Sequence, residues 1–98
     1  MSSGNRKVFK YGLGPIQDQY DYLLPEGFEV VHVGEQNHGT VTIWALVNPD
    51  AKYAKATFYL RGTGHPVPDD ATHIGSWEHK PFVWHFFAAT NQDSEDSA

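Results

Sequence analysis

The chain has 98 residues, a formal net charge of −5, 40% apolar residues and no cysteine. This length suits one domain, and without cysteine a disulfide scaffold, a cysteine zinc site and a thiol nucleophile are excluded. Three acidic residues, Asp93, Glu95 and Asp96, lie near the end, which leaves seven basic against nine acidic residues in 1–90. Because this body lacks a clustered basic surface, we expect no general nucleic-acid binding.

No apolar run approaches the roughly 18 residues of a membrane span, and the first residues lack the apolar region of a secretory signal. We therefore expect a cytoplasmic protein with no membrane partner. The composition predicts a flexible N-terminus over residues 1–6, a single β domain over 7–90 and a disordered acidic tail over 91–98.

The first expected strand covers residues 7–11, and Gly12 to Pro15 end it. Residues 16–24 admit two interpretations. Their apolar residues Ile16, Tyr20, Leu23 and Leu24 have helical spacing, whereas Pro25 forces an end, so the segment is either one or two helical turns or an extended crossover.

Five more strands follow, separated by turn residues. We expect them over residues 28–35, 40–47, 53–61, 71–78 and 82–88, with a hairpin turn at 36–39 and a rigid loop at 62–70. In 53–61, Ala54, Ala56, Phe58 and Leu60 should face the core, and Lys55, Thr57, Tyr59 and Arg61 the solvent. The fold class is all-β, or β-rich with one short helix, with about six antiparallel strands in a small sandwich or partly open barrel.

The last strand is apolar on both faces. Phe82, Trp84 and Phe86 fall on one face, and Val83 and Phe87 on the other. Such a strand is either central in its sheet or covered, by residues 16–24 or by a second subunit.

The Gly62-Thr63-Gly64-His65-Pro66 stretch is either a structural turn or a ligand-contacting loop, since Gly-x-Gly can aim backbone N–H groups at an anion. Large aromatic residues form either the core or a stacking platform, and Tyr59 is the best candidate for stacking. If the domain holds a ligand, we expect the following residues to bind it: Tyr59, Arg61, Gly62, Gly64, His65 and His73.

Six histidines raise the question of a metal site. His73, His79 and His85 share parity, with Asp69, Asp70 and Glu78 near them in the sequence, but neither His-x-His nor His-Glu-x-x-His occurs. We expect no metal and no cofactor, and we interpret His85 as a core histidine with one hydrogen bond. The single His-x-Thr unit, His38 to Thr40, falls in a turn.

Five short stretches, in this order and spacing, resemble a family of small proteins of unknown function carried by bacteriophages and by bacteria such as actinobacteria. They are Tyr11-Gly12-Leu13, Trp44 to Val47, Gly62 to Pro66, His73-Ile74-Gly75 and Phe82 to Phe86. The resemblance spans about residues 7–88 and implies a phage-type accessory protein in the bacterial host cytoplasm. It brings no catalytic residue with it.

These observations favour a non-enzymatic binding module that engages a host protein or captures a small anionic ligand such as a nucleotide, with itself as a further partner in a homodimer. One alternative is a small hydrolase or phosphodiesterase that uses His65, His73 or His85 with Asp70. A virion or assembly component is another.

Overall fold

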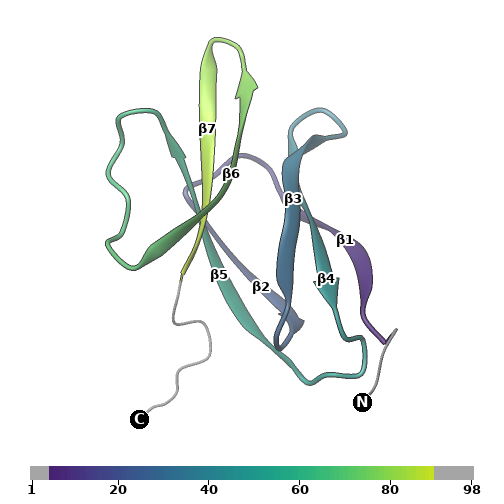
Figure 1. The fold of residues 1–98 in the computed structure, drawn as a ribbon. Coiled ribbons are helices and arrows are strands. Elements are labelled where there is room, and N and C mark those ends of the chain that lie inside the picture. The colour runs from purple at the N-terminus through teal and green to yellow at the C-terminus, as the bar shows by residue number, and fades with distance from the viewer. Residues whose placement is uncertain (1–4, 90–98) are drawn as a thin grey trace.

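The structure, a computed structural model, describes residues 5–89, and all of their regular structure is β-strand (Figure 1). This confirms the all-β class, with seven strands in place of about six. The predicted acidic tail, 91–98, and residues 1–4 of the predicted N-terminal segment lie outside the described residues. The strands are β1 (Lys7–Gly14), β2 (Gln19–Pro25), β3 (Glu29–Gln36), β4 (Thr40–Val47), β5 (Tyr53–Gly62), β6 (Ala71–His79) and β7 (Phe82–Ala89).

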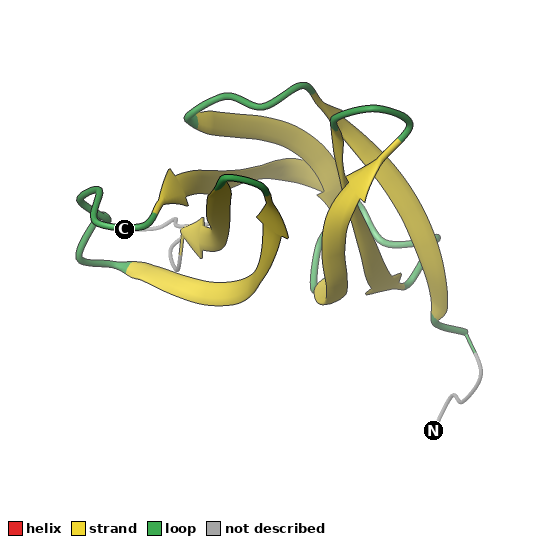
Figure 2. Cartoon of the chain, turned by 90° about the horizontal axis from the view of Figure 1, so that it is seen from above, coloured by secondary structure: helices red, strands yellow, loops and turns green. Residues whose placement is uncertain are grey.

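The strands form two antiparallel sheets that pack as a small sandwich. The first sheet has the order β1-β4-β3 and the second the order β2-β5-β7-β6. The seven described strands do not close into a barrel (Figure 2). After β1, β2 and β4 the chain passes from one sheet to the other, so neither sheet is built from one continuous stretch of sequence.

The predicted hairpin between residues 28–35 and 40–47 is confirmed. β3 and β4 pair antiparallel, with Gln36 opposite Thr40. In the turn, Asn37, His38 and Gly39 have φ angles of 51°, 63° and 108°. Positive φ values match the right-handed twist of the two strands, and asparagine and glycine adopt them most readily.

The ambiguous segment 16–24 is extended, because residues 19–25 form the edge strand β2 against β5. Tyr20 and Leu24 point into the core and Tyr22 is half-buried, whereas Leu23 is 62% exposed. The apolar residues of this segment therefore fit both a helical spacing and a two-residue alternation, and in the structure the segment follows the alternation and forms a strand. The open edge of β5 gives the segment backbone hydrogen bonds that an isolated short helix would not receive from the rest of the fold.

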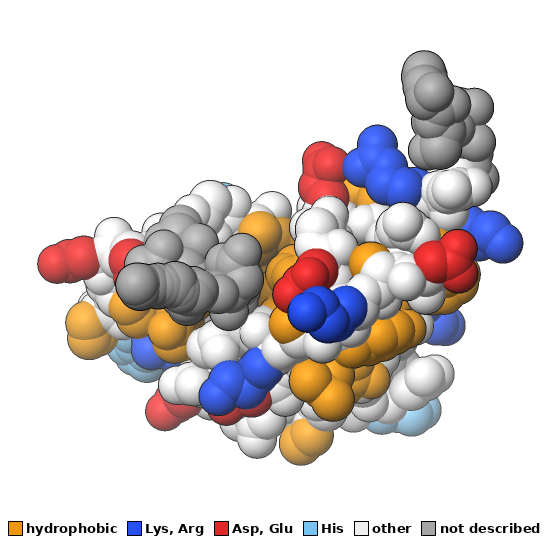
Figure 3. Space-filling model, turned by 90° about the horizontal axis from the view of Figure 1, so that it is seen from below, with side chains coloured by type: hydrophobic (Ala, Val, Ile, Leu, Met, Phe, Trp, Pro, Cys, Tyr) orange, Lys and Arg blue, Asp and Glu red, His pale blue; other side chains and the backbone are white. Residues whose placement is uncertain are grey.

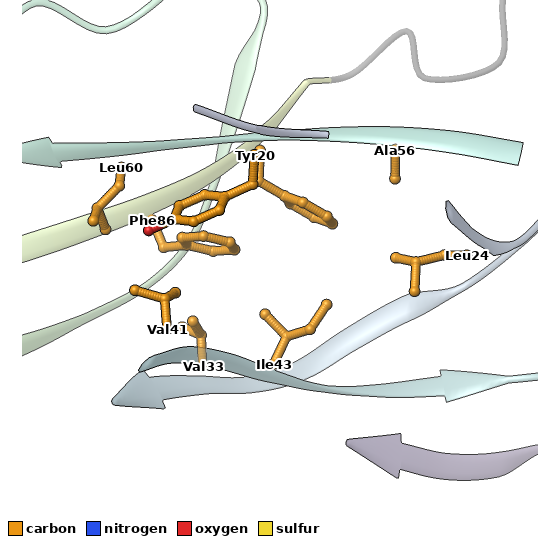
Figure 4. Close-up of a cluster of buried hydrophobic side chains, with 9 residues drawn as sticks. Tyr20, Leu24, Val33, Val41, Ile43, Ala56, Leu60 and Phe86 are labelled. Carbon is orange, nitrogen blue, oxygen red and sulfur yellow. The ribbon is translucent and has the colours of Figure 1, made fainter. Parts of the chain in front are cut away.

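The core lies between the two sheets (Figure 4). The alternation predicted for 53–61 is confirmed, since Ala56, Phe58 and Leu60 are buried and the residues between them are not. The Phe58 ring stacks on Phe86 with centroids 5.2 Å apart. The first sheet contributes further buried side chains to this cluster: Val33, Val41 and Ile43.

The strand that is apolar on both faces, β7, is central in its sheet, between β5 and β6. Phe86 is fully buried in the core, and Tyr20 from the segment 16–24 contacts it with ring centroids 6.2 Å apart. Phe82 and Val83, at the β6–β7 hairpin, are 55% and 39% exposed. The most exposed apolar side chains of β7 thus lie at the end of this hairpin.

The two sheets approach each other most closely along their edge strands β3 and β6. Gly75 lies there opposite Val33, where a Cβ atom on residue 75 would be 2.8 Å from Val33 Cγ1. The register of β6 against β7 also shifts between His73 and Gly75, as in a β-bulge. Gly75 therefore meets two needs of the fold, a close approach of the sheets and a bulge.

Candidate functional site

The outer face of the second sheet carries two rows of side chains that run across its strands. Tyr59 on β5 lies opposite Phe87 on β7, and Phe87 lies opposite His73 on β6. In the neighbouring row, Arg61 lies opposite His85, and His85 opposite Ser76. One row therefore presents planar rings, and the other a guanidinium, an imidazole and a hydroxyl.

The bulge at Gly75 brings His73 and Ser76 to the same face. In a regular strand, residues three apart point to opposite faces. The extra residue between the pairs His73–Phe87 and Ser76–His85 restores the parity, and both side chains are exposed. Sequence alternation alone therefore missed Ser76, although a glycine inside a strand is the signal that marks a bulge.

Three of these polar side chains form a continuous hydrogen-bonded chain with Thr63. His73 Nε2 lies 3.0 Å from Ser76 Oγ, and Ser76 Oγ lies 2.8 Å from His85 Nδ1. The other ring nitrogen, His85 Nε2, lies 2.9 Å from Thr63 Oγ1 in the loop that follows β5. The interpretation of His85 as a core histidine with one hydrogen bond is wrong: Phe86 points into the core, so its neighbour His85 points outward and both ring nitrogens are bonded.

Arg61 is held in place by the backbone around it. Its guanidinium donates to the carbonyl oxygens of Pro66 (2.9 Å), Asp18 (2.7 Å) and Leu60 (3.0 Å). It also lies over the Tyr59 ring, 5.4 Å from the centroid. Carbonyl groups have no formal charge, so these bonds orient the guanidinium without neutralising it.

The loop after β5 lies at the border of this face, and its residues line two hollows. A turn closed by the bond from the His65 N–H to the Gly62 carbonyl (3.1 Å), with Gly64 at φ 90°, places the His65 ring against Gly62. One hollow of about 460 Å³ is lined by Asp18, Arg61, His65, Pro66, Val67 and Pro68. A second, of about 370 Å³, is lined by Gly62, Thr63, His65 and residues 81–84.

The six residues predicted to bind a ligand fall into two neighbouring groups. Tyr59, Arg61 and His73 share the outer face, and His65 lines both hollows at its border. Gly62 lies in β5 opposite Trp84, and Gly64 lies in the turn. That these two glycines donate backbone hydrogen bonds to a ligand stays a prediction. Four further residues border the site but are not among the six predicted ligand residues: Thr63, Ser76, His85 and Phe87.

Within residues 5–89, no group of three or more histidine, aspartate or glutamate side chains is arranged to hold a metal ion. His73 and His85 share the outer face, but His79 belongs to a different contact. Its Nδ1 lies 2.8 Å from Glu35 Oε1, which also accepts a bond of 2.7 Å from the Trp77 indole. The parity shared by His73, His79 and His85 in the sequence is broken by the bulge in β6.

Another hollow, of about 690 Å³, lies elsewhere, between the β3–β4 turn and the end of β6. One of its lining residues is Glu35, whose side chain is 14% exposed. Because the Trp77 and His79 donors on β6 both bond Oε1 of this carboxylate, we interpret the contact as a link between the two sheets.

The Ser76–His85 pair has the form of a nucleophile and a base, but its surroundings differ from those of a catalytic triad. In a triad the second imidazole nitrogen binds a carboxylate, which stabilises the imidazolium that forms. Here its partner is the Thr63 hydroxyl, which carries no charge. The arrangement therefore suits hydrogen bonding to a ligand better than removal of a proton from Ser76.

Fold and site together describe a small β-sandwich with one exposed sheet face of rings, hydroxyls and imidazoles. No helix in residues 5–89 is long and apolar enough to cross a membrane. The chain belongs to the family described as "Domain of unknown function (DUF7352)", whose model matches residues 4–97. This confirms the resemblance to a family of unknown function. No curated protein and no solved structure matches the chain.

Proposed function

We propose that this protein is a non-enzymatic binding module that captures a small anionic ligand on the outer face of its second sheet. The observation that supports this most is the pair of neighbouring rows, rings in one and hydrogen-bond donors in the other. A mononucleotide or cyclic nucleotide combines a planar base with an anionic phosphate and matches both rows.

Each residue would act through its ordinary chemistry. The base would lie against the half-buried rings of Tyr59 and Phe87, since aromatic stacking accepts any base. Arg61 would supply the positive charge and His65 a polar contact from the loop. Gly62 and Gly64 would add backbone donors.

The size and charge of the molecule favour a small ligand over a nucleic-acid strand. Ligand pockets usually measure about 300–1,000 Å³, and the hollow beside Arg61 and His65 measures about 460 Å³. A nucleic-acid groove needs a continuous basic track. On the underside of the molecule, by contrast, basic and acidic side chains are interspersed among apolar ones (Figure 3).

A thermal-shift panel of nucleotides and cyclic nucleotides tests this function. We expect at least one ligand to raise Tm, and His73→Gln and Tyr59→Leu to reduce the shift. Lys55→Gln is the matched control, because Lys55 is exposed on the same strand, six residues before Arg61. If no compound of the panel raises Tm and direct binding assays are also negative, the proposed function is wrong.

We infer the biological setting from the sequence resemblance. On that basis the protein would be an accessory protein of phage type that acts in the cytoplasm of a bacterial host. Its ligand would then belong to the host's pool of small anions. Expression of the protein during infection, and recovery of a bound nucleotide from the protein purified out of infected cells, would support this setting.

Self-association or capture of a host protein is a second candidate function, and one observation favours it. Phe82 and Val83 are exposed beside the 370 Å³ hollow. An apolar patch at the end of a hairpin is typical of a protein contact. Sedimentation velocity of the wild type and of Phe82→Ser tests self-association. A dimer in the wild type that is lost in the variant supports the contact. If both proteins are monomers, the patch does not mediate self-association. Large oligomers without ligand would instead indicate an assembly component.

A further inference from the structure

At a given protonation state, a fixed number of donor hydrogens is available to the hydrogen-bonded chain that runs through Thr63, His85, Ser76 and His73. Its three contacts measure 2.9, 2.8 and 3.0 Å, and each needs one hydrogen. A hydroxyl supplies one hydrogen, and a neutral imidazole also supplies one, on either of its nitrogens. The four groups together therefore hold four hydrogens for three contacts.

With both imidazoles neutral, three arrangements of the hydrogens satisfy all three contacts. If His85 donates to Thr63, then Ser76 donates to His85, His73 donates to Ser76, and the Thr63 hydroxyl hydrogen is left over. If His85 donates to Ser76, Thr63 donates to His85. Ser76 then either donates to His73, which leaves an N–H on His73, or also accepts from His73, which leaves the Ser76 hydroxyl hydrogen free. In every case the hydrogen-bonded chain offers a ligand one donor.

A proton on His85 changes this supply. Both ring nitrogens then donate, to Thr63 and to Ser76, so the Thr63 hydrogen is released. The Ser76 oxygen accepts from His85 and from His73, and its own hydrogen is released as well. The chain now presents two neighbouring hydroxyl donors and a positive charge to the solvent side, where Thr63 and Ser76 are exposed.

The charged groups around the chain come from every neighbouring element. Arg61 on β5 lies opposite His85. Glu78, opposite Val83, and the second imidazole, His73, lie on β6, and His65 and Asp18 border the adjoining hollow. A bound anion adds a negative charge that favours the protonated imidazole.

We propose that Ser76 and Thr63, with His85 between them, form a site for an oxyanion such as a phosphate or sulfate group, and that occupation of this site is coupled to the uptake of a proton. This inference rests on the proposed function. It adds that the protein binds the ligand through its oxyanion group and that binding requires the uptake of a proton. Arg61, one strand away, would neutralise the same anion. The affinity for the anion rises as the pH falls through the range in which histidines titrate, about pH 5 to 8.

The test uses two probes whose own charge is constant between about pH 5 and 8, sulfate and 3′,5′-cyclic AMP, so that any pH dependence belongs to the protein. We expect calorimetry to show tighter binding of cyclic AMP at low pH, by up to tenfold per pH unit for one coupled proton. Buffers with different ionisation heats should reveal the proton uptake. Sulfate should compete with cyclic AMP at pH 5.5, and NMR should show the His85 ring signals shifting on binding.

Two variants and one control locate the coupling. His85→Gln keeps a donor but cannot titrate, so it should bind cyclic AMP with an affinity that no longer depends on pH. Ser76→Ala should weaken sulfate competition. His38→Gln, in the distant β3–β4 turn, should behave like the wild type. Cyclic AMP binding that is independent of pH in the wild type, or unaffected by sulfate, overturns this inference and leaves the proposed function standing. If neither cyclic AMP nor sulfate binds at any pH, this inference is also overturned, and the proposed function is overturned with it only if every other nucleotide of the panel fails to bind as well.

Discussion

Two tyrosine hydroxyls in the sandwich have opposite surroundings. The Tyr20 hydroxyl donates to the Pro15 carbonyl (2.5 Å) and accepts from the Gln17 N–H (3.1 Å), which fastens the loop between the sheets. The Tyr11 hydroxyl is buried and has no hydrogen-bond partner among residues 5–89. Burial raises the pKa of both phenols above the ordinary value. An unpaired buried hydroxyl destabilises the folded state, whereas a paired one stabilises it.

We therefore expect opposite effects from the same substitution at the two sites. Tyr20→Phe removes two hydrogen bonds and should lower the free energy of unfolding by about 1–2 kcal/mol. Tyr11→Phe removes an unpaired polar atom and should leave stability unchanged or raise it by up to about 1 kcal/mol. Urea unfolding of both variants measures the difference, and a loss at Tyr11 as large as that at Tyr20 would contradict it.

Asp21 illustrates a pKa shift at the surface. Thr57 Oγ1 donates to its carboxylate at 2.8 Å and Gln19 Nε2 at 3.3 Å, and these bonds lower the pKa of Asp21 below its ordinary value of 3.8. A carboxyl whose pKa is lower in the folded state stabilises the fold above the unfolded pKa. That contribution disappears as the pH falls through the folded value.

The expected result is an Asp21 pKa below 3.8 in an NMR titration, and a rise toward 3.8 in Thr57→Val. The second observable is stability: between neutral pH and pH 3 the wild type should lose slightly more than Thr57→Val does. Equal Asp21 titration curves in the two proteins would show that the Thr57 bond does not cause the shift.

At the scale of elements, the sequence predicts a regular alternation of apolar and polar side chains, but it does not predict where a bulge interrupts that alternation. The two faces of β5 follow from residues 53–61, because apolar and polar side chains simply alternate there. The outer face of β6 does not, because the bulge at Gly75 moves Ser76 to the side of His73. Tyr59, Arg61 and His73 were selected from the sequence alone, before the pairing of β5, β7 and β6 was known. In the structure these three predicted ligand residues lie on one face.

The pairing itself depends on distant parts of the chain. β2 pairs with β5, and Tyr20 lies opposite Phe58, 38 positions later. Whether residues 16–24 form a helix or a strand was therefore decided by an edge that the local sequence does not contain. For the same reason the contact of His85 with Thr63 was not predictable, since it joins the middle of β7 to a loop that precedes β6.

The close approach of β6 to β3 at Gly75 can be tested by substitution. Its Cβ position lies 2.8 Å from Val33, so Gly75→Ala must push β6 away from β3 and should cost about 1–3 kcal/mol of stability. Gly12→Ala is the control, because its nearest neighbour, Thr40 Cγ2, is at an ordinary 3.5 Å. Chemical denaturation compares them. Val33→Ala in the Gly75→Ala background should cost less than Val33→Ala alone, and simple additivity of the two would argue against a direct clash.

At the scale of the whole molecule, one carboxylate joins the two sheets at their meeting edge. Glu35 on β3 accepts hydrogen bonds from Trp77 and His79 on β6. Glu35→Ala leaves the Trp77 indole without this acceptor and should destabilise the protein by about 1–3 kcal/mol. Tryptophan fluorescence and far-UV circular dichroism should still follow the same unfolding curve, because both sheets share one core. Two separate transitions would mean that the sheets unfold independently.

The repeated passage of the chain between the sheets also bears on synthesis at the ribosome. β1, β3 and β4 can pair once residue 47 has emerged, but β2, which is made between β1 and β3, has no partner until β5 follows. During that interval the apolar side of β2, with Tyr20 and Leu24, is exposed in a growing chain that already holds three paired strands. Between residue 47 and the completion of β5, the nascent protein therefore exposes this apolar surface to aggregation or chaperone binding.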